Sequence, residues 1–277
     1  MMRPMKIQTT KPSKGNRAMN TATFGSAFLT LALSCMVSHA SAQQSPETDD
    51  RIEAAAKSSY VFRTYLVDDS VQTDAKEGVV TLTGSVKEIS HKQLAEDTVA
   101  ALPGVKSVEN KIEARDTPPE NSDTWLYLKV KSTLAYHRSV SAFNTQVDMK
   151  EGTATLKGEA SSQAQKDLVT EYTKDIVGIK EVSNQMTITN PAKEVEPTLA
   201  MMIDDASITA QVRMALLSHR STSNIRTMVA TNEGVVTLAG NANNAAEVDL
   251  VTKLVTDIHG VKSVVNNMTV AVSSSGN

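Results

Sequence analysis

Cysteine is almost absent from this sequence. The one cysteine among the 277 residues is Cys35, which falls in an N-terminal segment that we expect to be removed. The remaining chain would then have no disulfide and no cysteine metal ligand. In an alternative interpretation, Cys35 is the lipid-modified first residue of a lipoprotein. The preceding Ala32-Leu33-Ser34 matches that motif poorly, because a leucine is expected three residues before the cysteine.

Long apolar runs are also absent. The run from Phe24 to Val37 is too short for a comfortable transmembrane helix. Five basic residues and no acidic residue precede it, and Ala40-Ser41-Ala42 follows it. This order is typical of a secretory signal peptide that is cleaved after Ala42. We therefore expect residues 1–42 to be a signal peptide and the mature chain to lie in the periplasm. An outer-membrane lipoprotein attached through Cys35 is the alternative location.

The chain has no excess of positive charge. Loss of the five leader residues Arg3, Lys6, Lys11, Lys14 and Arg17 would reduce the 28 basic residues to 23, against 31 acidic residues, for a mature net charge of −8. This charge argues against nucleic acid as a partner, because nucleic-acid binding depends on attraction to phosphates. Any contact with an anionic membrane would have to be local.

Motifs of catalysis and cofactor binding are missing as well. The sequence has no phosphate-binding loop, no Ser-His-Asp spacing and no paired-carboxylate motif above chance. His137-Arg138 aligns with His219-Arg220, but one histidine per repeat cannot supply the three or four ligands of a metal site. We expect no enzyme activity, no cofactor and no metal.

What the sequence does contain is one unit repeated three times. Each copy has a block E-G-x-x-T-L-x-G and, 27 residues after its first residue, a block G-[VI]-K-x-V-x-N. The first block begins at Glu77, Glu151 and Glu233, and the second at Gly104, Gly178 and Gly260. Equal spacing in three copies indicates an internal repeat of one structural unit.

The pattern within each copy predicts an α-β-β-α-β module of about 65 residues. Apolar residues at i, i+4 and i+8, such as Ile52, Ala56 and Tyr60, predict the first helix. Asp49, Asp123 and Asp205 are predicted to cap these helices. The second helix lets the last strand run parallel to the one before it. We expect three α+β modules, each a small three-stranded mixed sheet covered by two helices. They span residues 49–114 (module 1), 123–189 (module 2) and 204–272 (module 3).

The two repeated blocks resemble the BON domain (bacterial OsmY and nodulation), whose central feature is a pair of glycines after the first strand and before the last. All three modules carry both glycines, and the resemblance covers nearly the whole mature chain. It implies a periplasmic or outer-membrane setting, protection during osmotic or envelope stress, and binding to phospholipid. The family has no known catalytic residues, so the resemblance assigns none here.

Three sets of aligned positions are framework candidates. We expect structural roles for the glycines, because turns and helix ends need conformations that glycine adopts cheaply. These glycines are Gly78, Gly84, Gly104, Gly152, Gly158, Gly178, Gly234, Gly240 and Gly260. Asn110, Asn184 and Asn266 lie on the apolar face of the last strand and bond either nearby backbone or a ligand. Lys106, Lys180 and Lys262 are either solvated or in contact with lipid phosphates.

Aromatic residues are few and unevenly distributed. Module 1 has Tyr60, Phe62 and Tyr65, module 2 has Trp125, Tyr127, Tyr136, Phe143 and Tyr172, and module 3 has none. The fold therefore does not require them. One explanation for their distribution is that the rings contact a membrane at the level of the lipid headgroups, and the other is that they pack between modules. We expect any lipid contact to lie on module 2, through Trp125, Tyr127, Tyr136 and Arg138.

Two functions remain open at this point. One is an envelope or osmotic-stress protein that contacts phospholipid membrane surfaces. The other is a periplasmic chaperone or scaffold that binds client proteins. Both would use exposed apolar patches. The oligomeric state does not follow from the sequence.

The leader hypothesis has a direct test. N-terminal sequencing of the exported protein should find Gln43 as the first residue, because the small residues of Ala40-Ser41-Ala42 suit signal peptidase. A mature protein that begins with lipid-modified Cys35 would contradict it.

Overall fold

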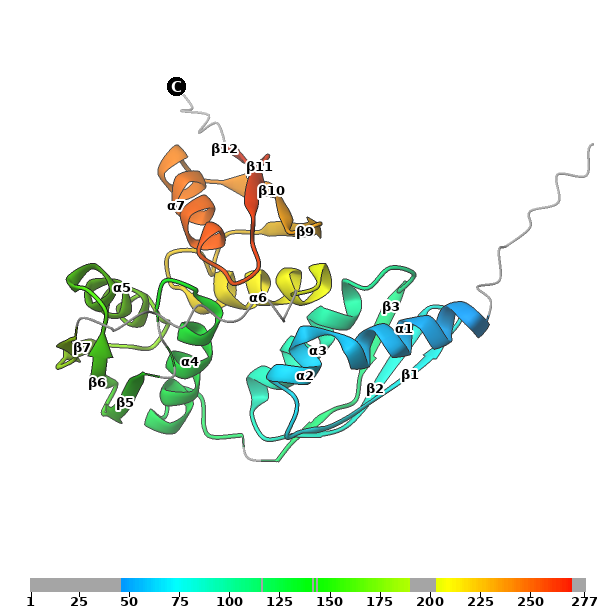
Figure 1. The fold of residues 1–277 in the computed structure, drawn as a ribbon, viewed down its shortest axis with the longest axis horizontal. Helices are drawn as coiled ribbons and strands as arrows, with labels where there is room; N and C mark the ends of the chain where they lie inside the picture. Colours follow the sequence, from blue (N-terminus) through cyan, green and yellow to red (C-terminus); the bar gives the residue numbers. More distant parts are fainter. Residues whose placement is uncertain (1–45, 116, 141, 143, 190–202, 271–277) are drawn as a thin grey trace, which may run out of the picture. The chain divides into compact units, whose positions relative to one another are not determined.

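The computed structural model describes residues 46–115, 117–140, 142, 144–189 and 203–270. The expected signal peptide, with Cys35 and Ala42, lies outside these residues. Each repeat forms a helix, a β-hairpin, a second helix and a last strand, coloured in sequence from blue to red in Figure 1. Over the described part of the chain, no helix is both long and apolar enough to cross a membrane.

The three modules share one order of elements. Module 1 contains α1 (Pro46–Ser58), α2 (Tyr60–Thr64), β1 (Ser70–Lys76), β2 (Val79–Val86), α3 (Ile89–Ala100), β3 (Ser107–Asn110) and β4 (Glu113–Ala114). Module 2 contains α4 (Asp123–Tyr136), β5 (Thr145–Lys150), β6 (Thr153–Ala160), α5 (Gln163–Lys174), β7 (Glu181–Asn184) and β8 (Thr187–Ile188). Module 3 contains α6 (Asp205–Ser218), β9 (Thr227–Asn232), β10 (Val235–Ala242), α7 (Ala245–Thr256), β11 (Ser263–Asn266) and β12 (Thr269–Val270).

The mixed sheet of the sequence prediction is present in every module. In module 1, β1 pairs antiparallel with β2, while β3 and β4 both pair parallel with β2. The last strand is therefore one extended segment with a short interruption. Asn110 lies at this interruption, where its Oδ1 accepts from the amide of Ile112 at 3.1 Å. The α+β class and the tandem repeat are confirmed.

The first helix of module 1 departs from its predicted pattern. We predicted a continuous stripe through Tyr60, but α1 ends at Ser58 and α2 begins at Tyr60. Module 3 stabilises this break, because Asp204 Oδ2 accepts from the amide of Tyr60 at 2.7 Å and Ser207 Oγ accepts from the amide of Val61 at 3.0 Å. As a result Val61 is fully buried, whereas Tyr60 is only half-buried.

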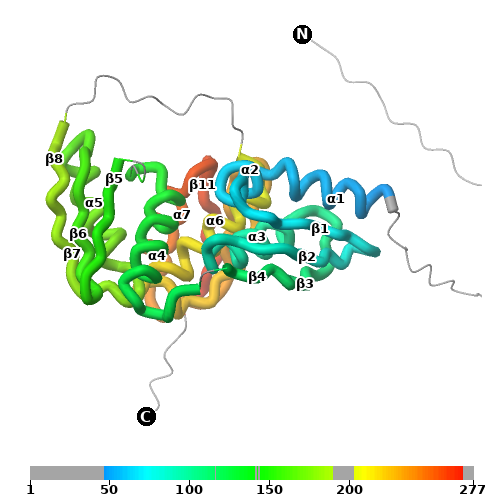
Figure 2. The backbone as a smooth tube through the Cα atoms, turned by 90° about the horizontal axis from the view of Figure 1, so that it is seen from below, coloured from blue at the N-terminus to red at the C-terminus, as the bar shows by residue number. Residues whose placement is uncertain are grey.

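Helix α6 lies at the junction of the modules, and Figure 2 shows it between α4 and α3. Buried residues occur around nearly its whole circumference, as expected for a helix that packs on several sides. The buried apolar residues of modules 1 and 3 form one continuous cluster, which also includes Tyr136, whereas module 2 has a cluster of its own. Modules 1 and 3 thus share a core although module 2 separates them in the sequence.

Two glycines of module 2 give a matched test of backbone strain. Gly158 has φ +116, and a Cβ there would lie 2.0 Å from the carbonyl oxygen of Asn144. Gly152 has φ +83, but its Cβ would meet only the flexible side chain of Lys180, at 3.1 Å. We expect Gly158→Ala to lower the free energy of unfolding by at least about 3 kcal/mol. Gly152→Ala should cost about 1–2 kcal/mol.

Urea denaturation followed by the fluorescence of Trp125 measures both variants, because Trp125 is the only tryptophan and packs on the module 2 core. Equal losses of stability would contradict the steric explanation for Gly158.

Candidate functional site

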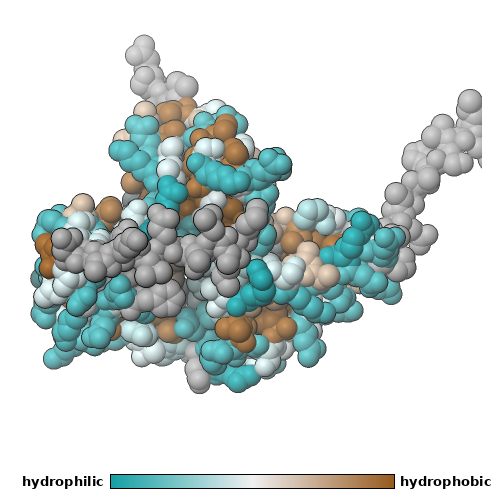
Figure 3. Space-filling model, in the orientation of Figure 1, coloured by the Kyte–Doolittle hydropathy of each residue, from teal (hydrophilic) through white to brown (hydrophobic). Residues whose placement is uncertain are grey.

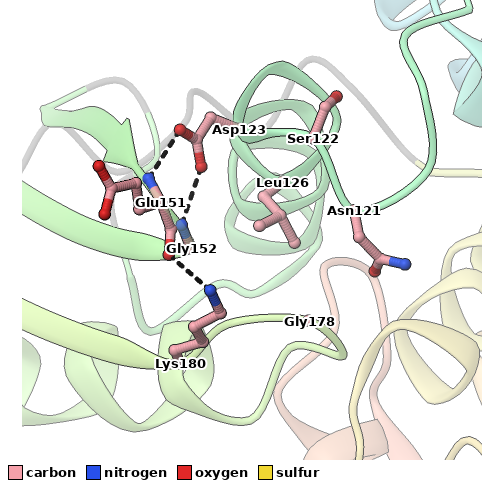
Figure 4. Close-up of a pocket in the computed structure, with 8 residues that line it drawn as sticks. All are labelled: Asn121, Ser122, Asp123, Leu126, Glu151, Gly152, Gly178 and Lys180. Carbon is pink, nitrogen blue, oxygen red and sulfur yellow. Dashed lines mark hydrogen bonds between the residues drawn. The ribbon is translucent and has the colours of Figure 1, made fainter.

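An aspartate holds the hairpin turn of each module. In module 2, the amides of Glu151 and Gly152 donate to the two oxygens of Asp123 at 2.7 and 2.8 Å, as Figure 4 shows. Both turn residues have positive φ, 54° and 83°, which is the pattern of a two-residue type I′ turn. A glutamate in this conformation is strained, so the two hydrogen bonds offset a local cost. They also lower the pKa of Asp123.

The predicted helix-capping role of these aspartates is wrong. Ser122 caps α4 and Asp204 caps α6, while Asp123 and Asp205 are the first residues inside the helices. Asp49 lies in the first turn of α1 and likewise accepts from the amides of Glu77 and Gly78, at 2.7 and 3.0 Å. Each aspartate stands 28 residues before the glutamate of its turn, and that constant spacing was the sequence signal for this contact.

A cavity of about 510 Å³ opens beside this turn in module 2. Figure 4 shows its lining residues, which are Asn121, Ser122, Asp123, Leu126, Glu151, Gly152, Gly178 and Lys180. The Lys180 ammonium donates to the carbonyl of Glu151 at 2.9 Å. The Lys180 ammonium and the Asp123 carboxylate both form hydrogen bonds with backbone groups of the turn. Neither is therefore paired with a nucleophile in the cavity. Among the residues that the structure describes, no three metal-binding side chains converge.

Two of the aligned lysines and all three aligned asparagines also have internal partners. Lys106 donates to the carbonyl of Glu77 at 2.8 Å, as Lys180 does in module 2. Each asparagine donates to a carbonyl of the second helix and accepts from the amide two residues later. These contacts explain their repetition without a ligand.

The four expected lipid-contact residues do not form one surface. Tyr136 is 1 % exposed, so its predicted contact with lipid is wrong for this arrangement. The Arg138 guanidinium donates to the carbonyl of Val261 in module 3 at 3.2 Å. Trp125 is half-buried with the Lys129 ammonium 4.4 Å from its ring centroid, and Tyr127 is 38 % exposed. The alternative explanation for the aromatic residues, packing between modules, applies to Tyr136. Its ring centroid lies 5.7 Å from that of Tyr65 in module 1.

The aligned histidines meet between modules 2 and 3. The Nε2 atoms of His137 and His219 lie 3.0 Å apart, and both rings are fully buried. Asp257 of module 3 lies 3.3 Å from Nδ1 of His137, and Asp175 of module 2 lies 3.2 Å from Nδ1 of His219. We call these four residues the histidine clasp. The shared His-Arg pair was visible in the sequence, but nothing there showed that the two copies touch.

Module 3 has an open sheet face without charge. Its outward residues on β9, β10 and β11 are Met228, Ala230, Asn232, Val235, Thr237, Ala239, Ser263 and Val265. The corresponding face carries Asp74, Lys76 and Glu109 in module 1, and Asp148, Lys150, Lys157 and Glu181 in module 2. Met228 is 70 % exposed and Val265 is 45 % exposed. Hydrophobic patches are visible over module 3 in the upper part of Figure 3.

The repeat, the mixed sheet and the paired glycines define a class of small α+β modules, and comparison with known families identifies it. The BON domain matches residues 48–116, 122–190 and 204–272. These matches cover most of the chain, so the protein belongs to the BON-domain family.

One curated relative is the osmotically-inducible protein Y of Escherichia coli (strain K12). It is 27 % identical over 146 residues, which are 53 % of this chain and 71 % of the relative. Among solved structures, the C-terminal domain of CdsD, a structural protein of the type III secretion system of Chlamydia trachomatis, is 16 % identical and has a TM-score of 0.22. That match covers 83 % of this chain and 100 % of the CdsD chain.

The PrgH periplasmic domain is 8 % identical with a TM-score of 0.19, covering 75 % of this chain and 98 % of its own. TM-scores this low carry no argument about function.

The aspartate-held turn predicts a local loss of stability. Asp49→Ala removes the acceptor of two turn amides, and we expect it to lower the free energy of unfolding by about 2 kcal/mol. The control is Asp50→Ala, because Asp50 is the exposed neighbour on the same helix turn and should cost less than about 0.5 kcal/mol. Urea unfolding followed by far-UV circular dichroism compares the two, and indistinguishable curves would contradict the role of Asp49.

Proposed function

We propose that this protein is a periplasmic binding protein of the osmotic or envelope stress response, not an enzyme, and that it contacts phospholipid membrane surfaces. Membership of the BON-domain family and similarity to an osmotically inducible relative support the stress role. The uncharged sheet face of module 3 is the observation that carries the membrane contact.

The contact belongs on module 3 for a physical reason. A chain with a mature net charge of −8 is not drawn to an anionic membrane over long range. Its contact surface must therefore avoid like charge and supply apolar area. The module 3 face has Met228 and Val265 exposed and no carboxylate, whereas the matching faces of modules 1 and 2 carry acidic residues.

The size of the face favours a membrane over a protein partner. Three strands about 4.8 Å apart, with residues about 3.3 Å apart, give a face of roughly 14 by 16 Å, or about 220 Å². A stable protein interface buries roughly 800 Å² on each partner. A bilayer needs no matching shape, so a small flat patch suffices. Tyr127, exposed on α4, is a further candidate contact, because tyrosine suits the headgroup region.

Vesicle flotation tests the proposal. The mature protein should float with vesicles of phosphatidylethanolamine and phosphatidylglycerol. Met228→Glu/Val265→Glu should weaken binding at least about tenfold, because two exposed apolar side chains that would insert into the membrane are replaced by charged ones. The control is Gln146→Glu/Ser183→Glu, which places the same charges at the equivalent positions of module 2 and should change binding less than about twofold.

Two outcomes would contradict the proposal. One is equal weakening by both double variants, which would show a general effect of charge. The other is a wild-type protein that ignores vesicles. If such a protein also suppresses aggregation of an unfolded client, the chaperone or scaffold function replaces the membrane contact.

A further inference from the structure

We propose that the histidine clasp is a pH-dependent latch between modules 2 and 3. It holds the two modules together near neutral pH and releases module 2 when both histidines become imidazolium ions. This inference is independent of the proposed membrane contact.

The two halves of the latch are built from equivalent residues. His137 follows α4 and His219 follows α6, each as the C-cap of the first helix of its module. Arg138 donates its amide to the carbonyl of Asp257 at 2.8 Å, and Arg220 donates its amide to the carbonyl of Asp175 at 2.5 Å. Each module thus supplies a His-Arg pair after its first helix and an aspartate at the end of its second helix. The His-Arg pair of one module contacts the aspartate of the other.

Side-chain contacts repeat the same relation. The Ser139 hydroxyl donates to Asp257, and the Ser221 hydroxyl donates to Asp175. A short antiparallel bridge accompanies each half, from His137 to Ile258 and from Ile176 to His219. Tyr172 interrupts the equivalence, because its ring stacks on His137 at 4.1 Å and its hydroxyl donates to Asp257 at 2.7 Å.

The Nε2–Nε2 contact limits how many protons the pair can hold. At 3.0 Å, one Nε2 must donate and the other must accept. Asp257 and Asp175 favour a proton on each Nδ1, although neither Nδ1 makes a well-aligned hydrogen bond. The closed pair can therefore hold at most three protons, one on each Nδ1 and one shared between the Nε2 atoms, which is one fewer than two imidazolium ions carry. A further proton would place two N–H groups against each other in a site without water access.

The charged and titratable groups around the pair do not remove this conflict. The groups that face it are Asp175, Asp257, Arg138, Arg220, His259 and Tyr172. The Arg138 guanidinium lies 3.9 Å from the Asp257 carboxylate, and the Arg220 guanidinium donates to the carbonyls of Ile176 and Ile179. Burial lowers the pKa of His137, Asp257 opposes this effect, and the nearby His219 adds to it. Burial also lowers the pKa of His259.

The direction of the pH effect follows from proton uptake. The closed pair holds at most three protons, whereas two imidazolium ions in the open state hold four, and burial also lowers the pKa of His137. The latch therefore weakens as the pH falls below the open-state histidine pKa of about 6.5. Burial alone would raise the pKa of Asp257, but the nearby His137 ring and the hydrogen bonds from the Ser139 and Tyr172 hydroxyls hold this pKa below its usual value. The carboxylate therefore does not titrate between pH 7 and 5.

Release would be local because of how the modules pack. Module 2 has its own apolar core, so it can separate without losing its interior. Module 1 cannot form the same latch, because Arg63 stands at the histidine position and Ala101 at the aspartate position. Separation of modules 2 and 3 would free the Arg138 guanidinium from Val261 and uncover Tyr172.

Hydrogen exchange on the full chain tests the latch. The amides of Arg138, Val177, Arg220 and His259 donate across the two modules, so their protection reports whether the latch is closed. After correction for intrinsic exchange rates, we expect their protection to fall at least about tenfold between pH 7.5 and pH 5.0, while amides inside the module 2 sheet stay protected. A tenfold loss of protection corresponds to a difference of about one unit in the pKa of one histidine between the closed and open states.

Variants separate the latch from other titrations. His137→Gln/His219→Gln removes the titrating pair, so most of the pH dependence of clasp protection should disappear, whether this variant is closed or open. His91→Gln is the control and should keep the wild-type pH dependence, and His259→Gln should keep most of it. His91 contacts Asp69 at 2.6 Å within module 1, and His259 lies beside the clasp. Wild-type protection that stays constant from pH 7.5 to 5.0, or a pH dependence as large in the double variant as in the wild type, would overturn the proposal.

Discussion

The aspartate carboxylate that binds the two turn amides is the contact on which each module depends. It ties the first turn of the first helix to the hairpin, across 28 residues of sequence. The hairpin turn sets the register of the two antiparallel strands. Register decides which side chains face the helices, and the second of these strands pairs with the last strand. The position of one carboxylate thus fixes the helix, the sheet and the core together.

The association of the modules rests on α6. A helix that is buried on nearly every side needs packing partners beyond the sheet of its own module. Module 1 covers one side, with Asp97 paired to Arg213 at 3.3 Å, and module 2 approaches through α4. The three modules are therefore not independent domains. Modules 1 and 3 share one core, and module 2 is attached to it through the histidine clasp and the buried ring of Tyr136.

The sequence predicted the features that depend on local chemistry. Strand order and repeat length followed from periodicity and turn residues, and the glycines at the turns and strand ends all have positive φ. Contacts between distant segments were not predictable. The break at Ser59 depends on acceptors from module 3, and the burial of Tyr136 depends on Tyr65 of module 1. The alignment of His137 with His219 was evident, but periodicity within a module says nothing about docking between modules.

The equivalence of the two clasp halves has a consequence for symmetry. Modules 2 and 3 present the same patch to each other, and each patch contains both the donor pair and the acceptor carboxylate. This is the geometry of an isologous, two-fold contact, as found in homodimers, here realised within one polypeptide. Such a contact restricts sequence change in pairs. Loss of one histidine leaves the other as a buried polar group without its partner, so positions 137 and 219 are constrained to change together.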